Sequence, residues 1–268
     1  MNRPIRTYIA AFKSGISTLM EYRIDFLTNS TLSLLIHALV QILLWESVFK
    51  SKGQGNIQGY TADSMYMYIC FVSLCTILTR SGRIERGVGD EIRNGDLNKY
   101  LLKPLSHLGF SGAMVAAEKV GTLLFALIIF PFFVFFTTYQ IHIIGAVWGM
   151  LILLTAIICK FFISMAISYL AFWYEETWTF HIILDISMVF LSGAMLPLSI
   201  LPAWILPISN LLPFQYFGYI PGALASGTIS ISNAPLYLFM SILWCLIFWM
   251  ITKSIWFLGM RKYGAFGG

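Results

Sequence analysis

The chain has 268 residues, of which 58% are hydrophobic and 11% are charged. Soluble domains carry about 25% charged residues, so this composition excludes an ordinary water-soluble protein and places the chain in a lipid bilayer. Lys and Arg outnumber Asp and Glu by 17 to 12, an excess that marks the cytoplasmic side of a membrane protein and does not require nucleic acid. The four cysteines lie in apolar runs without histidines at ligand spacing, and we expect them to be buried hydrophobic side chains.

Residues 4–23 predict an amphipathic helix. Apolar residues such as Ile5 and Ile9 recur at steps of three and four, and Arg6 and Lys13 lie off that stripe. Such a helix lies in the membrane surface with its apolar face down, although a soluble helix packed on a partner has the same pattern. The segment has no continuous apolar core, so we expect no cleavable signal peptide.

Six apolar stretches predict an all-α integral membrane protein with six transmembrane helices. The predicted spans are residues 26–48, 63–80, 120–139, 144–173, 178–196 and 235–258. If the N-terminus lies inside, the inner segments hold 13 Lys and Arg residues and the outer segments hold two. This bias predicts that both termini and the long 80–119 loop are cytoplasmic.

The segment from residue 197 to residue 233 is apolar but rich in proline. Each proline removes an amide donor and disfavours helix in the residue before it, so several short helical pieces are expected. They form either a re-entrant pair of short helices in the outer leaflet or a hydrophobic loop that rests on the bilayer. The residues that define this segment and its approach are Gly193, Pro197, Pro202, Pro213, Phe214 and Pro221.

Three polar residues interrupt the predicted spans, namely Lys160, His181 and Asp185. A lone charge at the bilayer centre costs about 3 kcal/mol on insertion scales. Counted from the inner turn, Lys160 and Asp185 lie at depths of about 22 and 15 Å, a gap that a lysine side chain can largely bridge. A structural ion pair, a solvated transport path and snorkelling are the three interpretations left open.

Residues 80–119 form the only long charged segment, and it mixes both signs within a short stretch. This pattern suits a short helix lodged in a groove of a soluble partner, where charge pairs set register; a solvated loop is the alternative. No phosphate-binding Gly-x-x-x-x-Gly-Lys-Ser/Thr loop, His-Glu-x-x-His or Gly-x-Ser-x-Gly occurs. We therefore expect no catalytic residue, no metal site and no cofactor in this chain.

Two ordered stretches resemble the permease subunits of ABC exporters of the ABC-2 class. The stretch "DEIRNGDLNKYLLKPLSHL" resembles an Ile-x-x-Gly-x-Leu-x-x-x-Leu-Leu-x-Pro-Leu signature of a small bacterial subfamily, and "LSGAMLPLSILPAWILPISNLLPFQYFGYIPGALASG" resembles that subfamily's Gly…Pro-Leu-Ser…Leu-Pro…Leu-Pro-Phe…Pro…Gly pattern. The first falls on Ile92, Gly95, Leu97, Leu101, Leu102, Pro104 and Leu105, and the second on Gly193, Pro197, Leu198, Ser199, Leu201, Pro202, Leu212, Pro213, Phe214, Pro221 and Gly227.

The resemblance implies a permease in a bacterial cytoplasmic membrane that pairs with a second permease, identical or a sister. Two cytoplasmic ABC ATPase subunits, carrying ATP and Mg, would drive export of a lipid-like, peptide or other amphipathic cargo past spans 1, 2 and 5. The implied ATPase-coupling residues are Arg83, Arg86, Glu91, Ile92, Arg93, Gly95, Asp96, Leu97 and Pro104, with Glu175 and Glu176 as a weaker second contact.

Two competing interpretations use the polar residues of the spans. An ion- or proton-coupled secondary transporter would use Lys160, His181 and Asp185 and would need no ATPase. A membrane-embedded transferase would use His181 and Asp185 as an acid/base pair and would turn over substrate as an isolated chain.

Overall fold

The computed structural model describes residues 3–51, 53, 56–101, 105–136 and 142–263. The described residues form α-helices and short 3₁₀ turns and contain no β-strand, which confirms the all-α prediction. The α-helices are α1 Arg3–Glu21, α2 Arg23–Ser51, α3 Ala62–Thr79, α4 Arg83–Arg93, α5 Asn98–Leu101, α6 His107–Phe136, α7 Ile143–Tyr169, α8 Trp178–Leu191, α9 Leu206–Leu211, α10 Tyr219–Ala225 and α11 Ala234–Lys262.

Five helical stretches of the described chain are long and apolar enough to cross a bilayer. They are Arg23–Ser51, Ala62–Arg93, His107–Pro131, Ile143–Phe172 and Ile231–Lys262. The second stretch joins α3 to α4, and its charged residues lie mainly in α4. The apolar α8 has 14 residues, about 21 Å of helix, which is shorter than the roughly 30 Å hydrocarbon core. An all-α membrane protein is confirmed, and the number of six spans stays a prediction.

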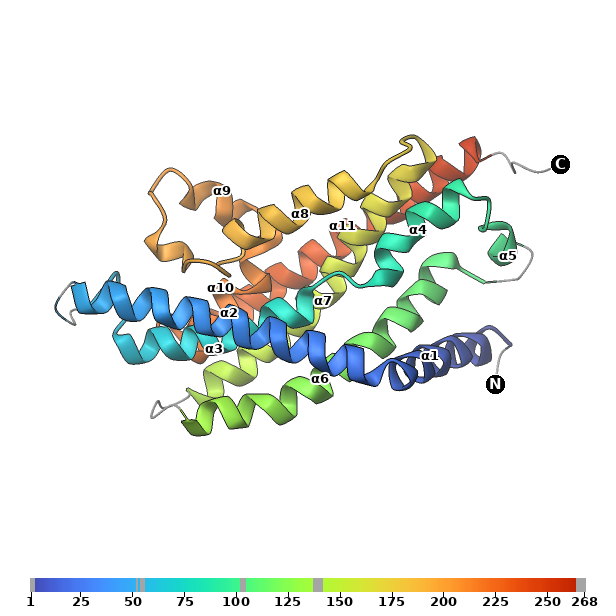
Figure 1. The fold of residues 1–268 in the computed structure, drawn as a ribbon. Helices are drawn as coiled ribbons and strands as arrows, with labels where there is room; N and C mark the ends of the chain where they lie inside the picture. The colour runs from blue at the N-terminus through green and yellow to red at the C-terminus, as the bar shows by residue number, and fades with distance from the viewer. Residues whose placement is uncertain (1–2, 52, 54–55, 102–104, 137–141, 264–268) are drawn as a thin grey trace.

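The helices run roughly along one bundle axis (Figure 1). Helix α1 begins and α11 ends at the end of the bundle that carries α4 and α5, whereas α9 lies at the opposite end (Figure 1). The segments predicted to be cytoplasmic therefore gather at one end of the molecule.

Helix α6 begins at His107, 13 residues before the predicted start of the third span at residue 120. Glu118 and Lys119, at the end of the predicted 80–119 loop, lie inside this helix. The structure accommodates both charges locally, because Lys119 Nζ donates to the backbone oxygen of Arg80 and the Glu118 carboxylate lies against Gly82. The predicted 80–119 loop is thus divided among α4, α5 and the first turns of α6.

Helix α1 covers most of the predicted amphipathic segment and packs along the first half of α6. The Tyr8 hydroxyl accepts a hydrogen bond from the Ser106 amide at 3.1 Å, and Ala11 is buried. Ile5, Ile9 and Met20 stay exposed on its surface. Part of its surface is therefore used within the chain, and its position in the membrane surface stays a prediction.

The core lies where α10 packs between α3 and α7. Close backbone approach makes this packing possible: a Cβ built on Gly145 of α7 would lie 1.9 Å from the Leu224 backbone oxygen. A Cβ on Gly222 of α10 would lie 2.6 Å from Val72 of α3. Residues 220–225 are all buried, so this part of the Pro-rich segment belongs to the protein interior.

The chain enters the Pro-rich segment through a tight turn. Helix α8 ends at Leu191, five residues before the predicted end of span 5, and Gly193 follows with a φ of +81°, which favours glycine. Tyr68 of α3 donates to the Gly193 carbonyl at 2.7 Å, and the Tyr219 amide donates to the Ser192 carbonyl at 2.6 Å. These bonds fix the end of α8 against α3 and the start of α10.

The segment then forms several short helical pieces, as the prolines predict. Pro197 precedes a 3₁₀ turn at residues 198–200, Pro213 begins another at residues 213–217, and Pro221 lies in the first turn of α10. The Pro202 carbonyl accepts from the Ile205 amide at 2.9 Å, and Phe214 packs edge-on against Phe217. The depth of these pieces in an outer leaflet stays a prediction.

Candidate functional site

A cleft of about 690 Å³ opens between α2, α3 and α8. Asn29, Ser33, His37 and Gln41 follow one another along α2 at intervals of four residues and all line this cleft. Residues four apart lie on one face of a helix, so they form a polar stripe on an otherwise apolar helix. Sequence reasoning missed this stripe, although the four-residue spacing was there to be found.

The middle of the cleft is held by polar contacts between its walls. His37 Nδ1 lies 2.9 Å from the Ser73 hydroxyl of α3, and Gln41 Nε2 donates to the Ala194 carbonyl at 3.5 Å. Gln41 Oε1 is buried and has no hydrogen-bond partner among the described residues. Ser192, Ala194 and Phe217 also line the cleft, so the turn after α8 bounds the end nearest to Gln41. A hydrogen-bond donor of a molecule inside the cleft could bind to the Gln41 Oε1 atom.

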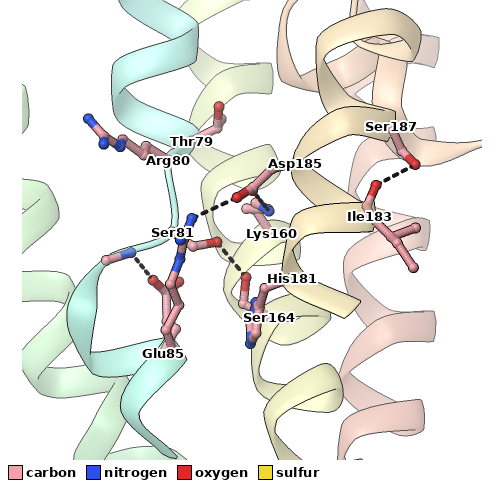
Figure 2. Close-up of polar contacts among 12 residues, drawn as sticks. Thr79, Arg80, Ser81, Glu85, Lys160, Ser164, His181, Ile183, Asp185 and Ser187 are labelled. Carbon is pink, nitrogen blue, oxygen red and sulfur yellow. Dashed lines mark hydrogen bonds and ion pairs between the residues drawn. The ribbon is translucent and has the colours of Figure 1, made fainter. Parts of the chain in front are cut away.

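A charge cluster lies at the opposite end of the cleft. Asp185 of α8 accepts from Arg86 of α4 at 2.6 Å and lies 3.7 Å from Lys160 Nζ of α7. Figure 2 shows the Asp185 and Lys160 side chains pointing toward one another from α8 and α7. The structure thus brings together Lys160 and Asp185, and it adds a partner, Arg86, that sequence reasoning had assigned only to ATPase contact.

The two cations in this cluster have different environments. The Lys160 side chain is 2% exposed, whereas Arg86 and Asp185 are 45% and 39% exposed. Among the described residues Lys160 Nζ has no hydrogen-bond partner, and its one carboxylate within ion-pair distance is Asp185 at 3.7 Å, with the buried Glu85 carboxylate as a second acidic group acting on it. A buried ammonium without a hydrogen bond is unfavourable, and Asp185 is the group that can relieve it.

His181 lies one turn before Asp185 on α8, but its ring contacts a different group. Its Nε2 lies 2.9 Å from the Ser168 hydroxyl of α7, and that hydroxyl donates to the Glu85 backbone oxygen. No contact joins His181 to Asp185 among the described residues. The two residues proposed for a membrane transferase therefore have different hydrogen-bond partners, and that interpretation stays untested.

The beginning of α4 is bonded to α7. The Ser81 and Ser164 hydroxyls lie 2.8 Å apart, and the buried Glu85 carboxylate caps α4 by accepting from the Gly82 amide (Figure 2). The Ser168 bond to Glu85 adds a second connection between the same two helices. These contacts hold the beginning of α4 against α7.

The signature residues around α4 divide into buried and exposed groups. Ile92 and Leu97 are buried against α7 near Tyr169, and Gly95, with a φ of +77°, ends α4. The Gly95 and Asp96 amides donate to the Ile92 and Glu91 carbonyls, which is the bonding of a Schellman cap. The side chains of Arg83, Arg86, Arg93 and Asp96 are exposed, and Pro104 lies outside the described residues.

The two segments predicted to contact the ATPase meet in the structure. Arg93 of α4 donates to the Glu175 carbonyl and pairs with Asp90, and Glu176 accepts from the Trp178 indole at 2.8 Å. The end of α4 and the turn between α7 and α8 therefore form one continuous surface.

Glu91 faces inward, unlike the charged side chains of Asp90 and Arg93 nearby. Its carboxylate contacts Lys99 at 3.1 Å, His107 Nε2 at 3.4 Å and the Tyr100 hydroxyl at 3.4 Å. Burial alone would raise the pKa of Glu91, but the bonds and charges of His107 and Lys99 outweigh it and lower the pKa. Glu91 therefore connects α4 to α5 and α6, and it is a poor residue with which to test contact with a partner.

The described residues contain no group of three His, Cys, Asp or Glu side chains that could hold a metal ion. The fold and the cleft define the class of the molecule: a polytopic α-helical membrane protein with a polar, charged cleft along one side.

A family model described as "ABC-2 family transporter protein" matches residues 35–267, and the chain belongs to this family. The resemblance found in the two sequence signatures is thus confirmed at the level of the family. No curated protein and no solved structure matches the chain.

Proposed function

We propose that this chain is the transmembrane permease subunit of an ATP-driven exporter and that the cleft between α2, α3 and α8 is its half of the transport path. A second permease, identical or a sister, would complete the path. Two ATPase subunits, with ATP and Mg bound to them, would sit below α4 and α5. The cargo class is amphipathic, because both polar and apolar side chains line the cleft.

The observation that carries this proposal is the Arg86–Asp185 contact. Arg86 belongs to α4, whose exposed charges form the surface offered to a soluble partner, and Asp185 belongs to α8, a wall of the cleft. A movement of α4 would therefore change the position or the charge balance of the cleft wall. The hydroxyl contacts between α4 and α7 provide the fixed side against which α4 would move.

Family membership implies that the energy source is an ABC ATPase on another chain. The sequence agrees with this, since no phosphate-binding loop occurs in it. The positive charges gather at the α4–α5 end, which supports a cytoplasmic position for that end and for both termini in a bacterial cytoplasmic membrane.

Affinity purification in mild detergent tests the proposal. We expect a Walker-A ATPase to co-purify with the tagged chain and to be lost when the exposed Asp90 and Asp96 are both changed to arginine. The matched control is Glu46→Arg, since the Glu46 side chain is exposed near the C-terminal end of α2, which lies at the other end of the bundle from α4. Equal recovery from the double variant and the control would remove α4 as the contact.

A second measurement separates the two energy sources. In proteoliposomes, the proposed permease loses transport when ATP is removed and keeps it when ion gradients are collapsed. The opposite pattern would establish the gradient-coupled carrier that the Lys160–Asp185 contact also allows.

A further inference from the structure

The end of the cleft near α4 carries a cation without a counter-ion. Arg80 follows α3, and its guanidinium crosses to α2, where it donates to the Ser33 hydroxyl at 3.2 Å. No carboxylate of the described residues lies within ion-pair distance of Arg80. Figure 2 shows its side chain turned away from Asp185. An exposed arginine held by a neutral hydroxyl keeps most of its donors free.

The cleft as a whole has excess positive charge. Its lining includes Arg80 and Arg86 but only one acidic residue, Asp185, which Arg86 already contacts. The excess among the lining residues is one positive charge.

The neighbouring hollow between α1, α2 and α6 does not neutralise Arg80. Arg80 lines this hollow as well, together with two further cations, Arg83 and Lys119, and two acidic residues, Asp25 and Glu118, so its lining also has an excess of one positive charge. The Asp25 carboxylate also accepts a hydrogen bond from Asn29 at 2.9 Å. Arg80 thus lines both hollows, and each of them has an excess of one positive charge.

The rest of the cleft suits an apolar chain. Leu32, Ile36 and Val40 of α2 line it and are each more than half exposed, and Met188 and Val189 line it from α8. From Leu32 to Val40 these apolar side chains extend over about 12 Å, because an α-helix rises 1.5 Å per residue. A small hydrophilic anion would leave this wall uncovered, whereas an amphiphile with an acidic headgroup would match both parts.

We propose that Arg80 binds the anionic headgroup, of phosphate type, of an amphipathic cargo whose tail lies along α2 and α8. This inference rests on the proposed function, since it names the substrate class of the same cleft. Arginine suits the role because its planar fork can donate two parallel hydrogen bonds to phosphate oxygens. A cationic amphiphile would add charge to a cleft that already has an excess of it.

The test uses the permease with its co-purified ATPase in phosphatidylcholine nanodiscs. The probes share a twelve-carbon chain: dodecyl phosphate, dodecyl phosphocholine and dodecyltrimethylammonium. We expect dodecyl phosphate to bind at least about tenfold more tightly than the other two, as suits a charge-assisted bond. Arg80→Gln should remove this preference and leave dodecyl phosphocholine binding within about twofold, and Arg80→Lys should keep part of it.

The matched control is Arg261→Gln, because Arg261 lies over the Phe257 ring on α11 and is outside the cleft. An unchanged phosphate preference in Arg80→Gln, or an equal loss for all three probes, would overturn the proposal. Saturation by inorganic phosphate alone, or displacement of the probe by phosphatidylglycerol in the nanodisc, would also overturn it, by assigning Arg80 to a free anion or to a bilayer lipid. Co-purification of the ATPase is measured on the same samples. Its loss would count against the proposed function and not against the role of Arg80.

Discussion

Helices α2 and α3 are neighbours in the chain and in space, yet they are packed very differently. In the most apolar part of the α3 stretch 72% of the residues are buried, whereas the figure for α2 is 28%. Helix α3 contacts α2, α6, α7 and α10, and α2 depends mainly on α3. This difference separates a fixed scaffold of α3, α7 and α10 from a lightly held wall of α2 and α8.

The two regions also use polar groups differently. In the scaffold the Tyr68 hydroxyl is buried and bonded to the Gly193 carbonyl, so it fixes a turn. Along the cleft, Gln41 Oε1 has no hydrogen-bond partner among the described residues. Satisfied groups fix a structure, and unsatisfied ones are available to a ligand or to a second conformation. The comparison predicts that substitutions in the scaffold lower the stability of the protein. Substitutions at the wall are predicted to change the coupling between the ATPase and the cleft.

The largest effect is expected at Gly145. A Cβ there would lie 1.9 Å from the Leu224 backbone oxygen, so Gly145→Ala must separate α7 from α10 at a loss of about 3 kcal/mol or more. Thermal unfolding can be followed in detergent with a thiol-reactive dye, because Cys70, Cys75 and Cys159 are buried. The control is Gly87→Ala, since no atom lies within 4 Å of a Cβ at Gly87. Equal unfolding temperatures for the two variants would contradict the fixed scaffold.

A smaller effect is expected where the scaffold meets the wall. Asp185→Ala leaves the buried Lys160 ammonium without its counter-ion, and because Asp185 is partly exposed we expect a loss of about 2 kcal/mol. Lys160→Met removes that ammonium, so the double variant should recover most of the lost stability. The same dye assay on all four proteins measures this coupling. Additive losses would show that the two side chains do not depend on one another.

Arg86→Gln is expected to change the stability of the protein little, but to weaken strongly the coupling between ATP binding and the cleft wall. An exposed ion pair contributes less than about 1 kcal/mol, so the unfolding temperature should be nearly unchanged. Val189→Cys on α8, made in a Cys245→Ser background, introduces a thiol in the cleft wall. The rate at which a thiol reagent labels it reports how accessible that wall is. We expect ATP to change that rate in the otherwise native complex and not in Arg86→Gln. An ATP response that persists without Arg86 would assign the transmission to other contacts.

The smallest effect is expected on the outer surface of the wall. Leu39 of α2 is 60% exposed, so Leu39→Ala should change stability by less than about 0.5 kcal/mol. Leu78 of α3 is fully buried, and the same substitution there should cost about 3 kcal/mol. Comparable unfolding temperatures for the two variants would remove the distinction between scaffold and wall.

The apolar pattern predicts the helices well because each long helix is apolar over most of its length. Helix α6 begins before the predicted third span because Glu118 and Lys119 lie against Gly82 and Arg80, which are remote in sequence. The start of the span itself stays a prediction. Depth arithmetic indicated the Lys160–Asp185 contact, but Arg86 lies 99 residues from Asp185 and no periodicity joins them. The burial of α10 also escaped prediction, since it depends on glycines of another helix.

The position of Lys160 has a consequence for how the protein is made. Helix α7 leaves the ribosome before Asp185, which follows Lys160 by 25 residues, so for a few seconds at ordinary rates of translation the ammonium has no acidic neighbour on α8. We therefore expect the translocon to retain α7 until α8 has been synthesised, and the two helices to enter the lipid as one hairpin.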